Sequence, residues 1–567
     1  MLLLPLWIAL AVLVNLLVIP RNLVRALSRR PRWIRLRFDG GIGERPAPRR
    51  RWWLPSRGEP SLSIADLESL GELLARDDKA VGVLLEIEGV HAGWARIESA
   101  RAAIASWRKS GKKVVAHLSS PGNAEVYLAL ACDEILVDES GPVGLIGVKA
   151  EVGFYGEALR RHGVDPELER IGDYKSYADT FMRGDMSAAH REATDLVLDG
   201  IAAQLVRALV EFRTVDAIDA GRAQAIVDGG PYNAQDALAA GLVNGVVYRD
   251  EVPARIGEKE SRIGSLDSYR RARPSWWVPP VFRRKRAIAV LSLEGNIVPG
   301  EGTSFLMKTV GADAAVRALD RLRENKRVAA VVLHVDSRGG SAAASDLIWR
   351  AVTRLAKDKP VVAYLGDAAA SGGYYIVAPC AHIVAQPTTL TGSIGVVGGK
   401  FSVERLLERL GVGTEILTRG RAAAMTTIRR RFDDAGRARL KSEIASTYQQ
   451  FVKKVAEGRK LEEPAVDAVA RGRVWLGRDA HPRKLVDKLG GLRDAIAEAR
   501  VRAKVKKRGP LQVVDVHPSP KRQGGGLISM LGGANGVRVM LEEELAVWRA
   551  LAKERALLWA DDLPEID

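Results

Sequence analysis

Hydrophobic residues along most of the chain follow an alternating pattern of strands and helices. Short β-branched and apolar runs, such as Val331–Val335, Val361–Leu365 and Ile383–Ala385, are separated by longer stretches with helical periodicity. Strands that alternate with helices are typical of an α/β domain with a largely parallel sheet. The pattern therefore predicts an α/β fold class.

The first apolar run differs from the others because of its length. From Leu2 to Ile19 only Asn15 has a polar side chain. At about 1.5 Å per helical residue, this run nearly spans the hydrocarbon core of a bilayer. The alternative is a cleaved signal peptide, which would have a basic start and a small-x-small cleavage site. The run has no Lys or Arg at its start, and Pro20-Arg21-Asn22 follows it in place of a cleavage site. We therefore predict a retained N-terminal transmembrane helix.

The chain also repeats itself at one constant spacing. Val83-Leu84-Leu85 precedes Val331-Val332-Leu333 by as many residues as Cys132 precedes Cys380. Gly144-Leu145-Ile146-Gly147-Val148 precedes Gly392-Ser393-Ile394-Gly395-Val396 by the same distance. A single long repeat indicates one duplicated domain and not a solenoid. The paired cysteines are then equivalent packing residues, and two cysteines exclude a disulfide framework.

Composition suggests where the two copies begin and end. Stretches rich in Arg, Pro, Gly or Trp indicate linkers, and the Gly-rich 524–536 segment precedes a predicted amphipathic helix at 541–558 for packing or oligomer contact. The predicted division is an anchor with basic flank at 1–36, a linker at 37–62, a first copy at 63–257, a linker at 258–286, a second copy at 287–500, and a C-terminal extension at 501–567.

The charge of the chain is strongly positive. Its 86 Lys and Arg exceed its 69 Asp and Glu, for a net charge of +17. Much of the excess lies in the flanking segments, and no zinc-finger spacing or RNA-binding signature accompanies it. Proximity to an anionic membrane explains the charge better than nucleic acid does. Because the positive charges follow the apolar run, the positive-inside rule places the rest of the chain in the cytoplasm.

The two copies differ where chemistry would be carried. The second copy has Ser371 among small residues at a predicted strand-to-helix turn, where the first copy has Asn123. The first copy has Lys175 after Gly172-Asp173-Tyr174, where the second has Ala423. Each copy thus keeps one half of a pair, which indicates a single shared site.

A serine hydroxyl needs a base to become a nucleophile. The eight histidines form no Ser-His-Asp pattern, so a Ser-Lys dyad is the alternative. Its lysine must be neutral, and burial would lower its pKa. The competing interpretations are a packing serine at a helix start and a solvated surface lysine, and the complementary losses favour the dyad.

Paired glycines after a buried strand complete the candidate site. Gly339 and Gly340 of the second copy, together with Gly372 beside the serine, could present backbone N–H groups as an oxyanion hole. The corresponding first-copy segment, Glu88 to Gly93, lacks the Gly-Gly pair.

Three motifs together carry a family resemblance. Ser371-Gly372-Gly373-Tyr374, Gly172-Asp173-Tyr174-Lys175-Ser176 and Leu390-Thr391-Gly392-Ser393-Ile394-Gly395, in a duplicated chain, resemble the long form of the signal peptide peptidase A family. That family belongs to the ClpP/crotonase-like structural class. The likeness spans roughly residues 60–500.

The resemblance implies roles for individual residues. Ser371 would be the nucleophile and Lys175 the general base, while Ser393 would hydrogen-bond the lysine and orient it. Gly339, Gly340 and Gly372 would form the oxyanion hole, with no cofactor and no metal. One departure is Arg338, where the family usually has proline before the Gly-Gly pair.

The resemblance also implies a setting for the activity. The chain would be a membrane-bound homo-oligomer, in a ring or bowl, that cleaves remnant signal peptides and similar apolar peptides without binding nucleic acid. Family members act on the outer membrane face, against the location that the charge pattern predicts. Two alternatives stay open: a crotonase-like acyl-CoA enzyme, and a non-catalytic membrane scaffold built on a peptidase fold.

Overall fold

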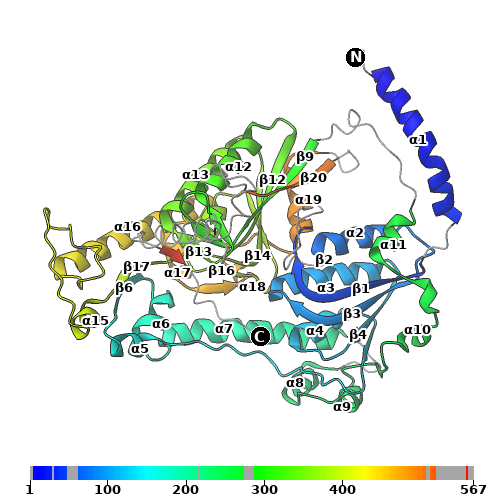
Figure 1. Ribbon diagram of the computed structural model, residues 1–567, viewed down its shortest axis with the longest axis horizontal. Helices are drawn as coiled ribbons and strands as arrows, with labels where there is room; N and C mark the ends of the chain where they lie inside the picture. The colour runs from blue at the N-terminus through cyan, green and yellow to red at the C-terminus, as the bar shows by residue number, and fades with distance from the viewer. Residues whose placement is uncertain are drawn as a thin grey trace. The chain divides into compact units, whose positions relative to one another are not determined.

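The chain forms two compact units in the computed structural model (Figure 1). The structure describes residues 4–27, 31–46, 62–212, 218–273, 286–302, 304, 307–505, 511–518 and 557–559. The first unit comprises residues up to Lys149 and Gly200–Lys285. The second comprises Ala150–Asp199 and the chain from Arg286 onward.

The first unit is built on a parallel sheet in the order β2-β1-β3-β4-β5-β7, with β8 also paired to β1. The central strand β3 is buried on both faces, as expected for a parallel sheet covered by helices. Its elements are α1 Leu4–Leu27, β1 Trp33–Gly43, β2 Leu62–Ser63, α2 Ile64–Leu74, β3 Gly82–His91, α3 Trp94–Lys109, β4 Lys113–Leu118, α4 Asn123–Ala129, β5 Glu134–Val137, α8 Ala220–Asp228, α9 Ala234–Ala239, β7 Gly245–Val246, α10 Val252–Arg255, a 3₁₀ turn Glu260–Arg262, β8 Ile263–Ser265 and α11 Leu266–Arg271.

The second unit contains two sheets. The larger has the order β18-β16-β14-β12-β9-β20, with β15 paired to β14 and β19 paired to β15. The smaller has the order β11-β10-β13-β21-β17-β6. The elements are α5 Gly156–Arg161, β6 Asp165–Ile171, α6 Tyr177–Met182, β9 Arg286–Glu294, β10 Asn296–Val298, β11 Thr309–Gly311, α12 Ala312–Glu324, β12 Val328–Ser337, β13 Gly339–Ser341, α13 Ala342–Asp358, β14 Val361–Ala370, α14 Gly372–Val377, β15 His382–Ala385, β16 Leu390–Gly392, β17 Val396–Ser402, α15 Glu404–Arg409, α16 Asp434–Arg459, α17 Glu463–Val469, β18 Val474–Leu476, α18 Gly477–Ala480, β19 Lys488–Leu489, α19 Leu492–Arg502, β20 Leu511–Val516 and β21 Leu557–Trp559. Helix α7, Ala188–Glu211, contributes residues to both units.

Strand β12 lies at the centre of the larger sheet, between β9 and β14. Its side chains alternate between two cores: Val331 and Leu333 pack with α12 and α13, whereas Val332 packs with α19. This is the period-two pattern of a strand that is buried on both faces, and Figure 1 shows α13 and α19 on its two sides. The predicted α/β class is thus realised in both units.

Segments predicted as linkers contain ordered structure. Strand β1 runs through the predicted basic flank and into the 37–62 linker, and it pairs with β3. Its apolar residues Ile34, Leu36 and Phe38 point into the core, while Arg35 and Arg37 form ion pairs with acidic residues. The intervening arginines hid this strand alternation in the sequence. In the 258–286 linker, β8 and α11 pack on β1.

The compact units also divide the chain differently from the linear copies predicted at 63–257 and 287–500. Residues 150–199, within the predicted first copy, belong to the second unit. The physical reason is β6, which pairs antiparallel with β17 along its whole length, from Asp165 opposite Ser402 to Ile171 opposite Val396.

The ends of the chain bear on two further predictions. In the part of the chain that the structure describes, no helix meets the combined length and apolarity needed to cross a membrane, and the predicted anchor stays a prediction. Of the predicted helix at 541–558, Leu557 and Leu558 instead lie in strand β21, and its other residues are outside the described part.

Candidate active site

Ser371 occupies the sharp turn between β14 and α14. Its backbone has φ 53° and ψ −115°, in a region that non-glycine residues rarely adopt. Two backbone hydrogen bonds hold this conformation: Ser371 N–H donates to Gly392 O at 2.8 Å, and Tyr375 N–H donates to Ser371 O at 2.9 Å. A strained backbone of this kind costs about 1–3 kcal/mol and persists only where the surroundings determine it. The turn fixes the direction of the Ser371 hydroxyl.

Lys175 reaches this hydroxyl from the loop that follows β6. The side chain is completely buried. Its Nζ lies 2.9 Å from Ser371 Oγ, 2.9 Å from Ser393 Oγ and 3.4 Å from Ser393 O. The three residues singled out in the sequence therefore meet at one amine, and all of them belong to the second unit.

Ser393 is held as firmly as Ser371. It follows β16, has φ 48°, and is almost fully buried. Its N–H donates to Arg473 O at 2.8 Å. With its backbone fixed in this way, Ser393 presents both its hydroxyl and its carbonyl oxygen to the Lys175 amine.

A short loop at residues 471–473 supports the lysine from behind. Tyr174 N–H donates to Arg471 O at 3.0 Å, and Gly472 N–H donates to Ile394 O at 2.8 Å. Gly472 has φ +82°, and a Cβ there would lie 2.4 Å from Lys175 N and 2.6 Å from Lys175 Cβ. Only glycine fits this position without moving Lys175. Nothing in the local sequence pattern marks Gly472, so its role could not be predicted from the sequence.

Tyr174, next to the lysine, is fixed by a polar and aromatic cluster. Its hydroxyl donates to Glu192 at 2.9 Å, and this hydrogen bond raises the pKa of Tyr174 and lowers the pKa of Glu192. The guanidinium of Arg473 lies 4.6 Å from the centres of the Tyr174 and Trp475 rings, within the range of cation–π contacts. Arg473 also pairs with Glu192 at 2.5 Å. The cluster ties the lysine loop to the residues that hold Ser393.

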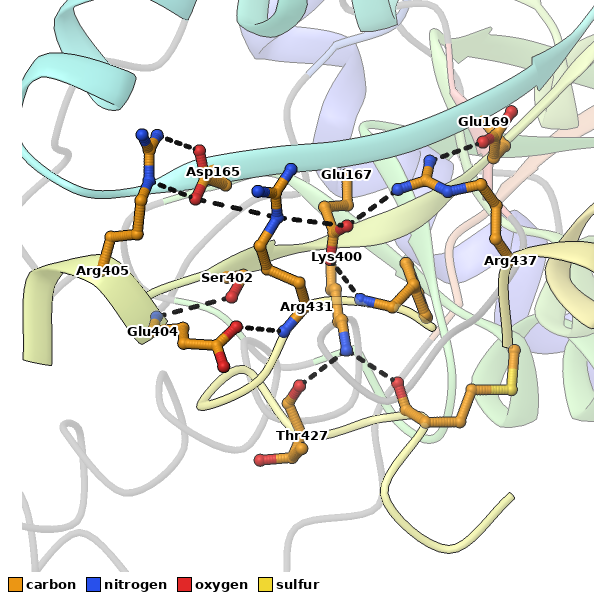
Figure 2. A network of polar contacts seen from close by, with 12 residues as sticks. Asp165, Glu167, Glu169, Lys400, Ser402, Glu404, Arg405, Thr427, Arg431 and Arg437 are labelled. Atoms are coloured by element: carbon orange, nitrogen blue, oxygen red, sulfur yellow. Dashed lines mark hydrogen bonds and ion pairs between the residues drawn. The ribbon is translucent and has the colours of Figure 1, made fainter. Parts of the chain in front are cut away.

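Strand β6 is anchored by a network of charges (Figure 2). Arg437 donates to Glu167 and Glu169, at 2.8 Å each, and Arg405 donates to Asp165 at 2.7 Å. Asp165 and Glu167 are buried. Removing either arginine would leave a buried carboxylate without its charged partner, which is unfavourable. The network therefore fixes β6, and with it the start of the Lys175 loop.

Lys400 of β17 lies on the same network. Its ammonium donates to Thr427 O at 2.9 Å and to Met425 O at 3.1 Å, and it lies 4.0 Å from the centre of the Phe432 ring. Burial lowers the pKa of Lys400. These contacts bind the 425–432 segment against the strand pair that carries the lysine loop (Figure 2).

The predicted oxyanion residues lie around the nucleophile turn. Gly339 and Gly340 form β13 with positive φ angles, and a Cβ on Gly340 would lie 2.0 Å from Ile297 O. Helix α14, which begins at Gly372, packs close to β13. Gly339 N–H donates to Ser337 Oγ at 3.1 Å. Gly340 and Gly372 are therefore the stronger candidates for binding a substrate oxygen.

The first-copy counterpart of Ser371 has a structural role. Asn123 begins α4, donates to Gly147 O at 2.8 Å, and accepts a hydrogen bond from Ile146 N–H at 3.1 Å. The residue thus closes a loop where the second copy places Ser371. Among the described residues, no cluster of three or more His, Cys, Asp or Glu side chains is placed to hold a metal ion.

The arrangement is capable of general-base chemistry. A buried amine that lies within hydrogen-bond distance of a serine hydroxyl can take its proton, and the backbone N–H groups nearby can stabilise an oxyanion.

Comparison with known proteins agrees with this geometry. The model of peptidase family S49 matches residues 106–262 and 353–506, more than half of the chain. "Serine protease SPPA, chloroplastic" from Arabidopsis thaliana is 33% identical over 459 residues, covering 80% of this chain and 67% of its own.

Bacterial relatives give the same result. "Protease 4" from Haemophilus influenzae is 30% identical over 442 residues, covering 75% of this chain and 70% of its own. "Protease 4" from Salmonella typhi is 31% identical over 441 residues, with 76% and 71% covered. The family resemblance found in the sequence is confirmed. With two matching regions and relatives of this similarity, the chain belongs to peptidase family S49 and is a serine-type endopeptidase.

Proposed function

We propose that the chain is a membrane-bound endopeptidase that cleaves signal peptides and similar apolar peptides through a Ser371–Lys175 dyad. One observation carries the proposal: the buried Lys175 Nζ lies 2.9 Å from the hydroxyls of both Ser371 and Ser393. The Lys175 amine thus contacts both the proposed nucleophile, Ser371, and Ser393, which orients the amine.

The reaction follows from these contacts. The neutral Lys175 amine takes the proton of Ser371 as Oγ attacks the peptide carbonyl carbon. Backbone N–H groups near Gly340 and Gly372 stabilise the oxyanion. When the C–N bond breaks, the Lys175 ammonium returns the proton to the leaving amine, and an acyl-enzyme forms. Water, deprotonated by the same amine, then attacks the ester carbonyl carbon. As the ester C–O bond breaks, the Lys175 ammonium returns the proton to Ser371 Oγ, which regenerates the free serine and the neutral amine.

Ser393 acts on the lysine and not on the substrate. Its hydroxyl and carbonyl oxygens both accept hydrogen bonds from Nζ. When the neutral amine donates both of its N–H bonds to Ser393, its lone pair is left facing the Ser371 hydroxyl. Loss of the Ser393 hydroxyl is therefore expected to lower the rate less than loss of Lys175.

The setting of the activity is also part of the proposal. The tandem copies adopt ClpP/crotonase-like folds, supported by the shared strand and glycine positions, and α1 anchors the chain in a membrane. Several α1 side chains are apolar and exposed, among them Leu13, Leu17 and Leu23. The substrate class is supported by the relative from Enterococcus faecium named "Putative signal peptide peptidase SppA", 33% identical over 213 residues. Homo-oligomeric assembly completes the proposal.

A serine-reactive fluorophosphonate probe tests the nucleophile. Wild-type protein should be labelled and should cleave an apolar reporter peptide, whereas Ser371→Ala should do neither. Ser345→Ala, which removes another buried serine hydroxyl from the same unit, is the control and should keep both properties. Labelling that persists in Ser371→Ala would refute the assignment.

A further inference from the structure

The carbonyl group of Lys175 is held by an arginine from the strand that leads to it. Arg170, near the end of β6, donates from Nη1 to Lys175 O at 3.1 Å. The N–H of Lys175 donates to Gly172 O at 3.2 Å. Both backbone polar groups of Lys175 are therefore fixed from within its own loop. The loop thus sets the point from which the buried side chain extends to Ser371.

Arg170 is in turn held by a buried carboxylate. Its Nη1 lies 2.8 Å from Oδ1 of Asp179, in the first turn of α6, and the Asp179 side chain is only 5% exposed. Ser187, just before α7, donates its hydroxyl to Asp179 Oδ2 at 2.7 Å. The N–H of Asp179 donates to Ser176 O at 2.7 Å. Both carboxylate oxygens therefore have a partner, and together they hold the guanidinium against Lys175 O.

An ion pair with a buried carboxylate is better explained at this place by its geometry than by stability. Desolvation offsets much of the attraction within a buried pair, so apolar residues can often replace such pairs at no cost in stability. A guanidinium offers several N–H donors in one plane. Arg170 can therefore bind the Asp179 carboxylate and the Lys175 carbonyl at the same time. The pair thus links α6 to the backbone of the proposed base.

The charges of the pair also cancel beside an amine that must be neutral to act. A like charge near Lys175 disfavours its ammonium form, and an opposite charge favours it. Residues 368–377 and 390–397, which include Ser371 and Ser393, contain no charged side chain. The neighbouring loop and α7 contribute charges in two ion pairs, Arg471 with Asp173 at 2.8 Å and Arg473 with Glu192 at 2.5 Å. The amine therefore lies among charges that compensate one another.

We propose that Arg170 and Asp179 are positioning residues for the Lys175 base: their ion pair holds the Lys175 carbonyl and presents no net charge to the amine. The inference rests on the proposed function, because it assigns how the proposed base is held. Loss of either partner should shift Lys175 and leave one charge beside it uncompensated. The chemical step should then slow. Peptide binding should change little, since neither residue is among the proposed oxyanion groups near Gly340 and Gly372.

Neutralising each partner in the full-length protein tests the proposal. In Asp179→Asn and in Arg170→Gln, kcat for an apolar reporter peptide should fall about tenfold to a hundredfold at nearly unchanged KM, because a displacement of about 1 Å at a reacting group costs that much. The pH midpoint of kcat/KM reports the base in the free enzyme. It should fall by about half a pH unit or more in Asp179→Asn, where the Arg170 cation remains. It should rise by a similar amount in Arg170→Gln, where the Asp179 carboxylate remains.

Combining the two substitutions separates charge from contact. The double variant leaves no uncompensated charge, so its pH midpoint should return close to that of wild type. Its kcat should stay low, because the contact with the Lys175 carbonyl is missing. Arg170→Lys keeps the charge without the planar fork of donors, and it should have the wild-type midpoint and an intermediate kcat. Asp320→Asn is the matched control and should change neither value, since it breaks the ion pair with Arg354, of 2.9 Å, between α12 and α13.

The outcomes separate this inference from the proposed function, with thermal unfolding as the check that each variant is folded. Wild-type kcat in Asp179→Asn and Arg170→Gln would overturn the inference. A lower kcat with both pH midpoints unchanged would overturn it as well, because the pair would then be only structural. If the neutral variants do not fold, Arg170→Lys decides, and wild-type kcat in that variant would count against the carbonyl contact. If wild type and Ser371→Ala cleave the reporter equally, the proposed function itself fails, whatever the other variants do.

Discussion

The backbone at Ser371 and Ser393 fixes the direction of the two hydroxyls that meet the Lys175 amine. Ser371 and Ser393 both have positive φ angles, and each is fixed by a backbone hydrogen bond of 2.8 Å. Ser371 could be predicted from the sequence because the two copies lose complementary residues, whereas Ser393 could be predicted only from the family resemblance. Gly472 could not, since its role comes from its distance to Lys175, a residue far away in the sequence.

Substitutions of the dyad test whether its members act as one unit. Lys175→Ala and Ser371→Ala should each remove nearly all turnover, and the double variant should be little worse than either, because residues of one catalytic unit are not additive. Lys175→Arg should also be inactive, since arginine stays protonated and cannot act as a base. Peptide kinetics on the folded variants is the measurement. Near wild-type kcat/KM in Lys175→Arg would exclude Lys175 as the base.

The pH dependence of turnover follows from the burial of Lys175. An exposed lysine titrates near 10.4, which would leave roughly one molecule in two thousand neutral at pH 7. Burial disfavours the ammonium form, so the neutral fraction at neutral pH should be larger than that. The base must be neutral, and kcat/KM should therefore rise with pH through the lysine transition and then level off. A rate that falls as pH rises from 6 to 9, with the fold intact, would contradict this.

At the scale of elements, the position of the lysine depends on contacts between segments distant in the sequence. The strand runs around β12 and β14 could be predicted from their apolar patterns. The pairing of β6 with β17 could not, because it depends on where Asp165, Glu167 and Glu169 find arginine partners. For the same reason the sequence pattern does not reveal β1, which spans the predicted basic flank and linker: Arg35 and Arg37 have acidic partners that only the fold brings near.

Replacing Gly472 should impair catalysis more than folding. Gly472→Ala places a Cβ 2.4 Å from Lys175 N, and a displacement of about 1 Å at a reacting group can lower the rate about a hundredfold. We expect kcat to fall by about that factor with little change in KM. Gly413→Ala is the control, because a Cβ there meets nothing within 4 Å. Equal kcat for the two variants would show that Gly472 does not position the lysine.

At the scale of the whole molecule, duplication and compact structure do not coincide. The sequence repeat predicts two linear copies, whereas residues 150–199 pack with the chain after Arg286. The sequence repeat reflects the duplication of an ancestral segment, whereas the compact units are defined by which segments pack and pair together. The proposed Ser371–Lys175 dyad, which is shared between the two copies in sequence, is therefore contained in one unit in space.

Membrane attachment tests the role of the N-terminal segment. The apolar, exposed side chains of α1 should keep the full-length chain in the membrane pellet after a carbonate wash, because burial in lipid removes their surface from water. A chain that starts at Pro31, which lacks α1 but keeps strand β1, should move largely to the supernatant. Equal distribution of the two proteins would argue against an anchor in α1.

Dividing the chain tests whether the second half is sufficient for activity. A fragment of residues 287–567 contains Ser371 and Ser393 but lacks β6 and Lys175, so β17 loses the partner with which it pairs along its length. The exposed edge of β17 should destabilise the fragment, and without a base it should not cleave peptides. Mixing it with a fragment of residues 1–286 should restore part of the activity, because β6 can pair with β17 again.

The control is a 1–286 fragment that carries Lys175→Ala. Mixed with the 287–567 fragment, it should restore the fold, measured by thermal unfolding, but not the activity. Full peptidase activity in the 287–567 fragment alone would refute the contribution of Lys175.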